Sequence, residues 1–111
     1  MRILPKLNNG RYKFITTEAA IVPAEAVAMI REAEGTTLIL PAAEGDTEVF
    51  AWISLANETQ LTATGITARF SSALAEAGIA CNVLAGFYHD HILVPYDKRN
   101  EAVEIIAALE V

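Results

Sequence analysis

Residues 48–55, EVFAWISL, constrain the fold most, because they predict a strand that is apolar on both of its faces. Successive side chains of a strand point to opposite sides of the sheet. One side carries Val49, Ala51, Ile53 and Leu55, and the other carries Phe50, Trp52 and Ser54. Apolar residues on both faces imply that both faces are covered. The chain is therefore expected to fold in layers around this strand.

Short apolar or alternating runs bounded by Gly, Pro or Asn predict the other strands, and runs with helical spacing predict two helices. Strands are expected at residues 10–16, 27–32, 36–41, 79–87 and 91–95, and helices at 65–78 and 98–110. Gly78 ends the first helix, and Asp97 is expected to cap the second. The apolar faces of the helices carry Ile66, Phe70, Ala73, Leu74 and Ala77, and Val103, Ile106 and Leu109.

Residues 27–32 are ambiguous, because Ala, Glu, Met and Arg favour a helix. Gly35 closes the run early, and the strand TTLILP begins directly after it. A connection this short suits a hairpin that turns at EAEGT. A strand is therefore the preferred assignment for residues 27–32.

The predicted order in the second half is strand, helix, strand, strand, helix, which puts the helices on one face of an antiparallel sheet. The expected fold class is α+β. The other face of the sheet needs a cover, which residues 10–41 or a second subunit would supply. The loop AEGD at 43–46 is the expected boundary between a mainly β unit at 1–45 and a strand-helix-strand-strand-helix unit at 46–111.

The composition narrows the classes of function. The chain has 111 residues, 53% of them hydrophobic, and a formal net charge of −6. Nucleic acid and anionic membranes are disfavoured as partners, because binding them requires clustered Lys and Arg. The apolar runs are too short to span a bilayer, and residues 1–7 lack the pattern of a signal peptide. The single cysteine, Cys81, fits a reducing compartment, so a cytoplasmic location is expected.

The segment LTATGITARFSSALAEAGIACNVLAGFYHDHILVP, residues 61–95, resembles an uncharacterised bacterial family of the ACT-domain superfamily. The resemblance is carried by the helix start with Leu and Thr, by LAEAGI, CNV and AGFYHDH, and by the Val-Pro exit. LNNGRYKF and REAEGTTLILP resemble the first half of that family, although the spacers at 17–25 and 42–48 are short for it. The resemblance implies a ferredoxin-like ACT-type sheet, as one unit or as two ACT-like halves in tandem. It also implies a regulatory domain that binds an amino acid or another small effector, often as a dimer, with no catalysis and no cofactor of its own.

The turn before the first helix is the candidate ligand site, because the resemblance implies that ACT-like domains commonly bind their effector there. The candidate residues in this turn are Thr62, Thr64, Gly65 and Ile66. Exposed N–H groups and the helix dipole favour a carboxylate, Gly65 permits close approach, and the hydroxyls can form hydrogen bonds. The alternative is that Thr64 only caps the helix. Asn82 joins the candidates, since an amide in an apolar strand needs a partner, although a backbone partner is favoured over a ligand.

His89 and His91 flank Asp90 and raise the question of a metal or acid–base site. On a strand the two histidines would share a face and could bind zinc. A zinc site needs a third and usually a fourth ligand, and carboxylates would have to supply them because the chain has no other histidine. The favoured interpretation is a tight hairpin in which Asp90 accepts hydrogen bonds from turn N–H groups. His91 would then face the opposing half of the chain or contact a ligand without being catalytic. Cys81 is expected to be a small buried side chain, with no partner that would activate it.

Three functions remain open. The favoured one is a homodimeric regulatory or sensor domain that binds an amino acid and catalyses nothing. The second is an interaction or oligomerisation module without a ligand. The third, least favoured, is a metal-dependent enzyme that uses His89, Asp90 and His91.

Overall fold

The computed structural model describes residues 1–57 and 61–111 as an α+β fold with one curled antiparallel sheet and two helices. The elements in chain order are β1 (Pro5–Leu7), β2 (Tyr12–Thr17), β3 (Ala28–Glu32), β4 (Gly35–Pro41), β5 (Phe50–Leu55), α1 (Ile66–Glu76), β6 (Asn82–Ala85), β7 (Asp90–Pro95), the 3-10 helix η1 (Tyr96–Lys98) and α2 (Arg99–Ala107). The strands lie in the order β3-β4-β2-β5-β7-β6, and β1 also pairs with β5.

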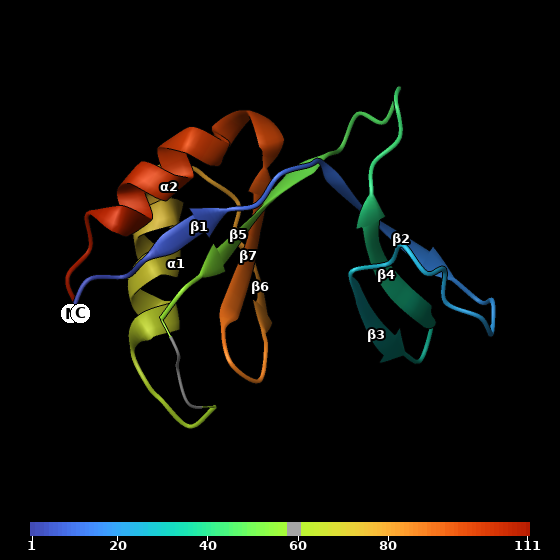
Figure 1. Ribbon diagram of the computed structural model, residues 1–111, viewed down its shortest axis with the longest axis horizontal. Helices are drawn as coiled ribbons and strands as arrows, with labels where there is room; N and C mark the ends of the chain where they lie inside the picture. The colour runs from blue at the N-terminus through green and yellow to red at the C-terminus, as the bar shows by residue number, and fades with distance from the viewer. Residues whose placement is uncertain (58–60) are drawn as a thin grey trace.

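Both helices cover one face of the sheet, over β1, β5, β7 and β6 (Figure 1). The side chains between the layers are apolar and almost fully buried. They include Phe70 and Leu74 of α1, Ala102 and Ile106 of α2, and Ala51, Ile53, Leu55, Ile92 and Val94 of the sheet. The α+β class and the helices on a single face are therefore confirmed. No helix in the described ranges has the length and apolar character needed to cross a membrane.

The chain ends meet beside β1. The Met1 ammonium donates to the Val111 carbonyl at 2.8 Å, and the Val111 N–H donates back to the Met1 carbonyl at 2.9 Å. Next to this contact, β1 pairs antiparallel with β5, with Leu7 opposite Ile53. The first residues of the chain thus add a strand to the helix-covered part of the sheet. The division of the chain at residue 45 stays a prediction.

The strand assignment for residues 27–32 is confirmed by β3, which pairs along β4 and returns through a two-residue turn at Ala33–Glu34. Glu32 lies opposite Gly35 at the end of this hairpin. A Cβ on Gly35 would lie 2.8 Å from the Thr16 hydroxyl on β2, so the close approach of the neighbouring strand requires glycine. Pairing with β4 therefore outweighs the helix propensity of this segment.

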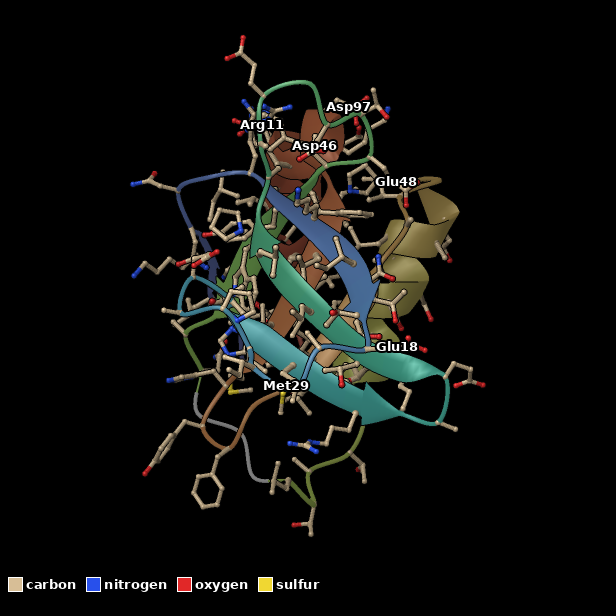
Figure 2. The ribbon with its side chains drawn as sticks, turned by 90° about the vertical axis from the view of Figure 1, so that its right-hand side faces the viewer. Arg11, Glu18, Met29, Asp46, Glu48 and Asp97 are labelled. Atoms are coloured by element: carbon tan, nitrogen blue, oxygen red, sulfur yellow. The ribbon has the colours of Figure 1, made fainter. Side chains whose placement is uncertain are left out.

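The sheet curls on the side away from the helices, at the point where β2 meets β5 (Figure 1). Only Tyr12 and Phe50 pair there, and aromatic contacts line the bend, with Tyr12 against Trp52 at 5.5 Å and Phe14 against Phe50 at 5.1 Å between ring centroids. Leu93 on this face is fully buried. Strands β2, β4 and β3 thus cover part of the sheet face opposite the helices, as the apolar residues on both faces of β5 predicted. Figure 2 views the molecule from the side of these three strands.

The predicted Asp97 cap is wrong, and the alternative interpretation of Thr64 as a helix cap does not hold either. Asp97 lies within η1, and α2 begins after Lys98 with no capping side chain, because the chain leaves Pro95 in a 3-10 turn before the helix starts. Thr64 does not cap α1, whose N-cap is Gly65 in the left-handed region at φ 94°. The conformation of the glycine, and not a hydroxyl, starts this helix.

Candidate functional site

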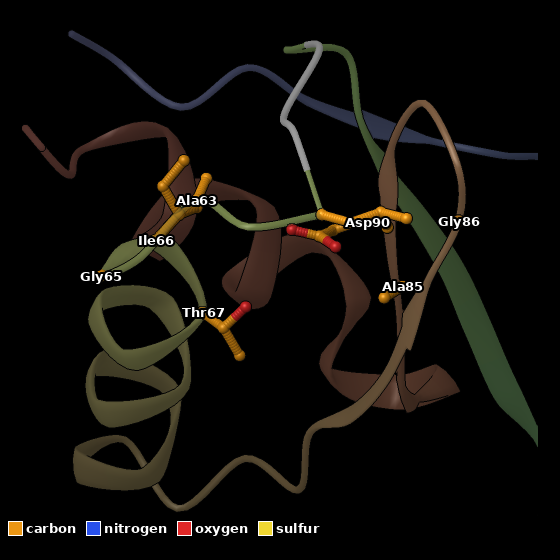
Figure 3. A pocket seen from close by; sticks show the side chains of 8 residues that line it. Ala63, Gly65, Ile66, Thr67, Ala85, Gly86 and Asp90 are labelled. Carbon is orange, nitrogen blue, oxygen red and sulfur yellow. The ribbon is translucent and has the colours of Figure 1, made fainter.

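A small pocket of about 160 Å³ lies between the first turn of α1 and the β6–β7 hairpin (Figure 3). Its lining consists of Leu61, Ala63, Gly65, Ile66, Thr67, Ala85, Gly86 and Asp90. At this pocket the loop after β5 lies next to the β6–β7 hairpin, although about twenty residues separate Ile66 from Ala85 in the sequence. We refer to it as the α1 pocket.

The start of α1 presents backbone donors to this pocket. The first intrahelical bond runs from the Arg69 N–H to the Gly65 carbonyl at 3.0 Å, so the amides of Ile66, Thr67 and Ala68 precede the helical ladder. In the described residues no side chain caps this end, and the first turn has no acidic residue. A Cβ on Gly65 would meet no atom within 4 Å, which leaves its surroundings open. The helix start is therefore a partially positive and accessible wall.

Asp90 provides the opposite charge. Its half-buried carboxylate is turned into the space between α1 and the hairpin, and the Thr67 hydroxyl is turned toward the same space (Figure 3). The prediction that Asp90 binds the turn amides is wrong for the described residues, where the hairpin is closed by the Gly86 N–H donating to the His89 carbonyl at 2.9 Å. The backbone closes the turn by itself, so the carboxylate is not used for this purpose and faces the pocket.

The structure brings only part of the predicted site together. Gly65 and Ile66 line the α1 pocket, whereas Thr62 and Thr64 are exposed in the same loop and lie outside its lining. Asn82 is exposed and donates from its Nδ2 to the Leu93 carbonyl at 3.3 Å, which is the backbone partner that was favoured for it. Ligand binding by any of these residues stays a prediction.

His91 lies on the other face of the sheet. Ile92 and Val94 on β7 belong to the core under the helices, so Asp90, two residues before Ile92, points to the helix side and His91 points away from it. The alternation of β7 was the signal in the sequence that could have found Asp90 as a residue of the α1 pocket and placed His91 outside it. Ligand binding by His91 stays a prediction. Thr67 was missed as well, because its role depends on where the hairpin packs against the helix.

His91 is held in one tautomer by two neighbours on β5. The Trp52 indole N–H donates to His91 Nδ1 at 3.2 Å, and because an indole nitrogen can only donate, Nδ1 must accept. The Ser54 hydroxyl lies 2.9 Å from the same nitrogen and receives a bond from Asn8 Nδ2 at 2.8 Å, so it donates to His91 as well. Neutral His91 therefore carries its proton on Nε2, which lies against Gly86.

This environment predicts a pH-dependent contribution to stability. Burial lowers the pKa of His91 below its ordinary value of 6.5, the charge of His89 adds to the shift, and Asp90 opposes it. Because the unfolded chain takes up this proton at a higher pH than the native one, the contribution is present above pH 6.5 and is lost as the pH falls through the lower native pKa. Urea unfolding of the native chain should therefore show a steeper loss of stability below pH 6.5 than unfolding of His91→Asn, which keeps an acceptor without titrating. Equal pH profiles for the two proteins would contradict the expectation.

The two histidines do not converge on one site. His89 Nδ1 lies 3.0 Å from the Asn57 carbonyl and donates to it, whereas His91 binds Trp52 and Ser54. Within residues 1–57 and 61–111, no group of three His, Cys, Asp or Glu side chains is placed to hold a metal ion. Cys81 is half-buried against the core, and burial raises the pKa of its thiol.

Comparison with solved structures supports the fold. A crystal structure of a Vibrio cholerae protein of unknown function, described as a possible transport protein, is 37% identical over 96% of this chain and 88% of that chain, with a TM-score of 0.87. A crystal structure of an Agrobacterium tumefaciens protein is 24% identical over the same shares, with a TM-score of 0.74, and this likeness supports the fold alone. No match is found among functionally curated proteins.

Comparison with family models identifies the family. One ACT-domain model matches residues 48–108, and a second ACT-domain model matches residues 2–61. Each match spans more than half of the chain, and together they suggest two ACT-like halves in tandem. The chain belongs to the ACT-domain family.

Proposed function

We propose that this protein is a regulatory or sensor domain that binds a small amino acid in the α1 pocket and has no catalytic activity of its own. ACT domains in general are regulatory domains that bind small molecules, which supports a regulatory or sensor function for this chain. The amino acid, the homodimer and the cytoplasmic location remain parts of the proposal.

The observation that carries the proposal is the pairing of opposite charges across the α1 pocket. An amino acid is a zwitterion, so its site needs donors for a carboxylate and an acceptor for an ammonium group. The amides of Ile66 and Thr67 at the helix start suit the carboxylate, and the Asp90 carboxylate suits the ammonium group. At about 160 Å³ the pocket is smaller than the usual range of about 300–1,000 Å³ for ligand sites, which favours a short side chain such as that of glycine, alanine or serine.

Regulation would act through the hairpin. Phe87 and Tyr88 at its tip are 74% and 62% exposed, and His89 ties its base to the loop after β5. A ligand between α1 and Asp90 would hold the hairpin against the helix and change how these two aromatic side chains meet a partner. The same exposed aromatics are the observation that favours the second function, an interaction module that needs no ligand.

A thermal-shift screen with the twenty common amino acids tests the proposal. A ligand at a hundredfold excess over its Kd should stabilise the protein by about 2.7 kcal/mol and raise its melting temperature by several degrees. Zinc and other divalent ions form a separate arm of the screen. A shift with zinc alone would favour the metal-dependent enzyme, and no shift with any compound would favour the interaction module.

Two variants of Gly65 locate the site. Asp and Asn tolerate the left-handed conformation at this position about equally, but only Asp adds a negative charge beside the ligand carboxylate. We expect Gly65→Asp to abolish the thermal shift with the amino acid and Gly65→Asn to retain a large part of it. A shift that survives equally in both variants would mean that the ligand binds elsewhere.

A further inference from the structure

A second cavity, of about 510 Å³, lies between β3 and β6, the two strands at the ends of the sheet. We call it the β3–β6 trough. It is lined by Val27, Ala28, Met29 and Ile30 on one side, by Val83, Leu84, Ala85 and Gly86 on the other, and by Trp52 and His91 at its floor. The trough lies on the side of the sheet opposite the helices, apart from the α1 pocket, and the two share only Ala85 and Gly86.

The walls of the trough are strand edges. A strand face presents every second residue to a cavity, because neighbouring side chains point in opposite directions. Here each wall consists of consecutive residues, 27–30 and 83–86. Only the edge of a strand, with its backbone groups, borders a cavity in this way. Within the described residues β3 pairs only with β4 and β6 only with β7, so both trough-facing edges lack a neighbouring strand.

The hydrogen-bond pattern of the hairpin identifies backbone groups that face the trough. The Gly86 N–H donates to the His89 carbonyl, which makes Gly86 and His89 a hydrogen-bonded pair. Such pairs alternate along an antiparallel ladder, so the peptide groups of Val83 and Ala85 point away from β7. The N–H and C=O groups of these two residues therefore point toward the trough, where they could form hydrogen bonds with an additional strand.

These edges lack the usual protection against strand addition. Exposed edges are normally blocked by charges, proline or bulges. The trough-lining stretches of β3 and β6 contain no charged residue and no proline, and Val27, Met29 and Ile30 are 47%, 44% and 44% exposed. Among the charged residues labelled in Figure 2, Arg11, Asp46, Glu48 and Asp97 lie toward the end of the molecule away from Met29, whereas Glu18 lies nearer to it. The trough therefore has uncharged walls with unpaired strand edges, in a chain of net charge −6.

We propose that the β3–β6 trough binds an extended peptide segment of a partner protein, with an uncharged apolar centre and basic flanks, as an additional strand between β3 and β6. The apolar centre matches the lining, and the basic flanks match the net negative charge of the chain. Backbone hydrogen bonds to the edges give affinity, as in other cases of strand addition.

The dimensions and the topology fit one such strand. A strand residue occupies about 160 Å³, from its rise, the strand spacing and the sheet thickness, so the trough accommodates about three residues of one strand and no hairpin. Because the pairs from β3 through β6 are all antiparallel, β3 and β6 run in opposite directions. The added strand therefore runs antiparallel to one edge and parallel to the other.

A second copy of the chain is a poorer occupant. A strand inserted between β3 and β6 needs both of its edges free, and each described strand already uses at least one edge within its own sheet, so a strand of another copy could take this place only by undoing that pairing. A segment that is unpaired in its own protein carries no such cost.

The test uses a fluorescein-labelled peptide of alternating valine and threonine with lysine at each end. Anisotropy should show saturable binding, and the fluorescence of Trp52, the single tryptophan, should change in parallel because it lies in the lining. The same peptide methylated at alternate backbone nitrogens keeps the side chains but loses donors, and it should bind at least tenfold more weakly.

Protein variants provide the matched arm. Ala85→Pro removes an N–H that faces the trough and not β7, so the fold should persist while the affinity falls about tenfold, and Ala85→Ser should bind like the native chain. Equal binding of the methylated peptide, or no binding of the parent peptide, would overturn the proposal. So would a concentration-dependent dimer in sedimentation that Ala85→Pro abolishes, because the occupant would then be a second copy.

Discussion

Replacing Asp90 by asparagine is expected to weaken binding of the amino acid that responds in the thermal-shift screen by about thirtyfold or more. This factor corresponds to about 2 kcal/mol, the lower end of the cost of removing one partner from a desolvated charge pair, and the lower end suits a half-buried carboxylate. The variant changes one carboxylate oxygen to an amide nitrogen and keeps the shape of the side chain. Isothermal titration calorimetry gives the two dissociation constants.

Chemical analogues make this expectation specific to the ammonium group. N-acetylation of the amino acid should weaken binding strongly in the native chain and add little further loss in Asp90→Asn, because the two changes remove the same interaction. Asp97→Asn is the matched control, since Asp97 is exposed in η1 and does not line the α1 pocket. Additive losses from the acetyl group and from Asp90→Asn would contradict the assigned contact.

Replacing Phe70 by alanine is expected to cost about 3–5 kcal/mol of the free energy of unfolding. Among the described residues Phe70 is the largest fully buried side chain, 0% exposed between α1 and the sheet, and its removal leaves a cavity in the layer where both helices meet the strands. Since domains of this kind have about 5–15 kcal/mol in total, the loss is a large fraction of the stability. Urea unfolding followed by Trp52 fluorescence measures it.

The chain offers a control of the same residue type. Phe87 at the tip of the hairpin is 74% exposed, so Phe87→Ala should change the free energy of unfolding by no more than about 0.5 kcal/mol. Similar losses from the two variants would mean that the packing of α1 on the sheet is not the main source of stability.

Much of the fold followed from periodicity and chain breaks. The alternation of residues 48–55 predicted a strand covered on both sides, and the short connection at Gly35 predicted the β3–β4 hairpin against helix propensity. The helix caps were not predictable in the same way. Whether Asp97 or Thr64 caps a helix depends on one or two backbone dihedral angles, and the turn after Pro95 and the left-handed Gly65 decided against both.

The candidate site was predicted in part for a similar reason. The loop before α1 can be located from the sequence, because a strand must end and a helix must start there. Which side chains of that loop and hairpin meet depends on packing, so Gly65 and Ile66 line the α1 pocket together with Thr67 and Asp90, while Thr62 and Thr64 do not. His91 was predicted as a ligand contact together with this loop. Ile92 and Val94 point into the core under the helices, so His91, next to Ile92 on the same strand, points to the opposite face of the sheet. The alternation of side chains along β7 was a better guide to which residues face the α1 pocket than their closeness to the loop.

The contact between Met1 and Val111 has a topological consequence. If the ends were joined by a short linker and the chain opened in the loop at 43–46, the new order would be β5, α1, β6, β7, α2, β1, followed by β2, β3 and β4. The helix-covered sheet would then be one continuous βαββαβ segment, because β1 already occupies the place beside β5 that the last strand of such a segment takes. A circular permutant of this kind should fold, and in it the three-stranded extension becomes a C-terminal appendage that can be trimmed separately.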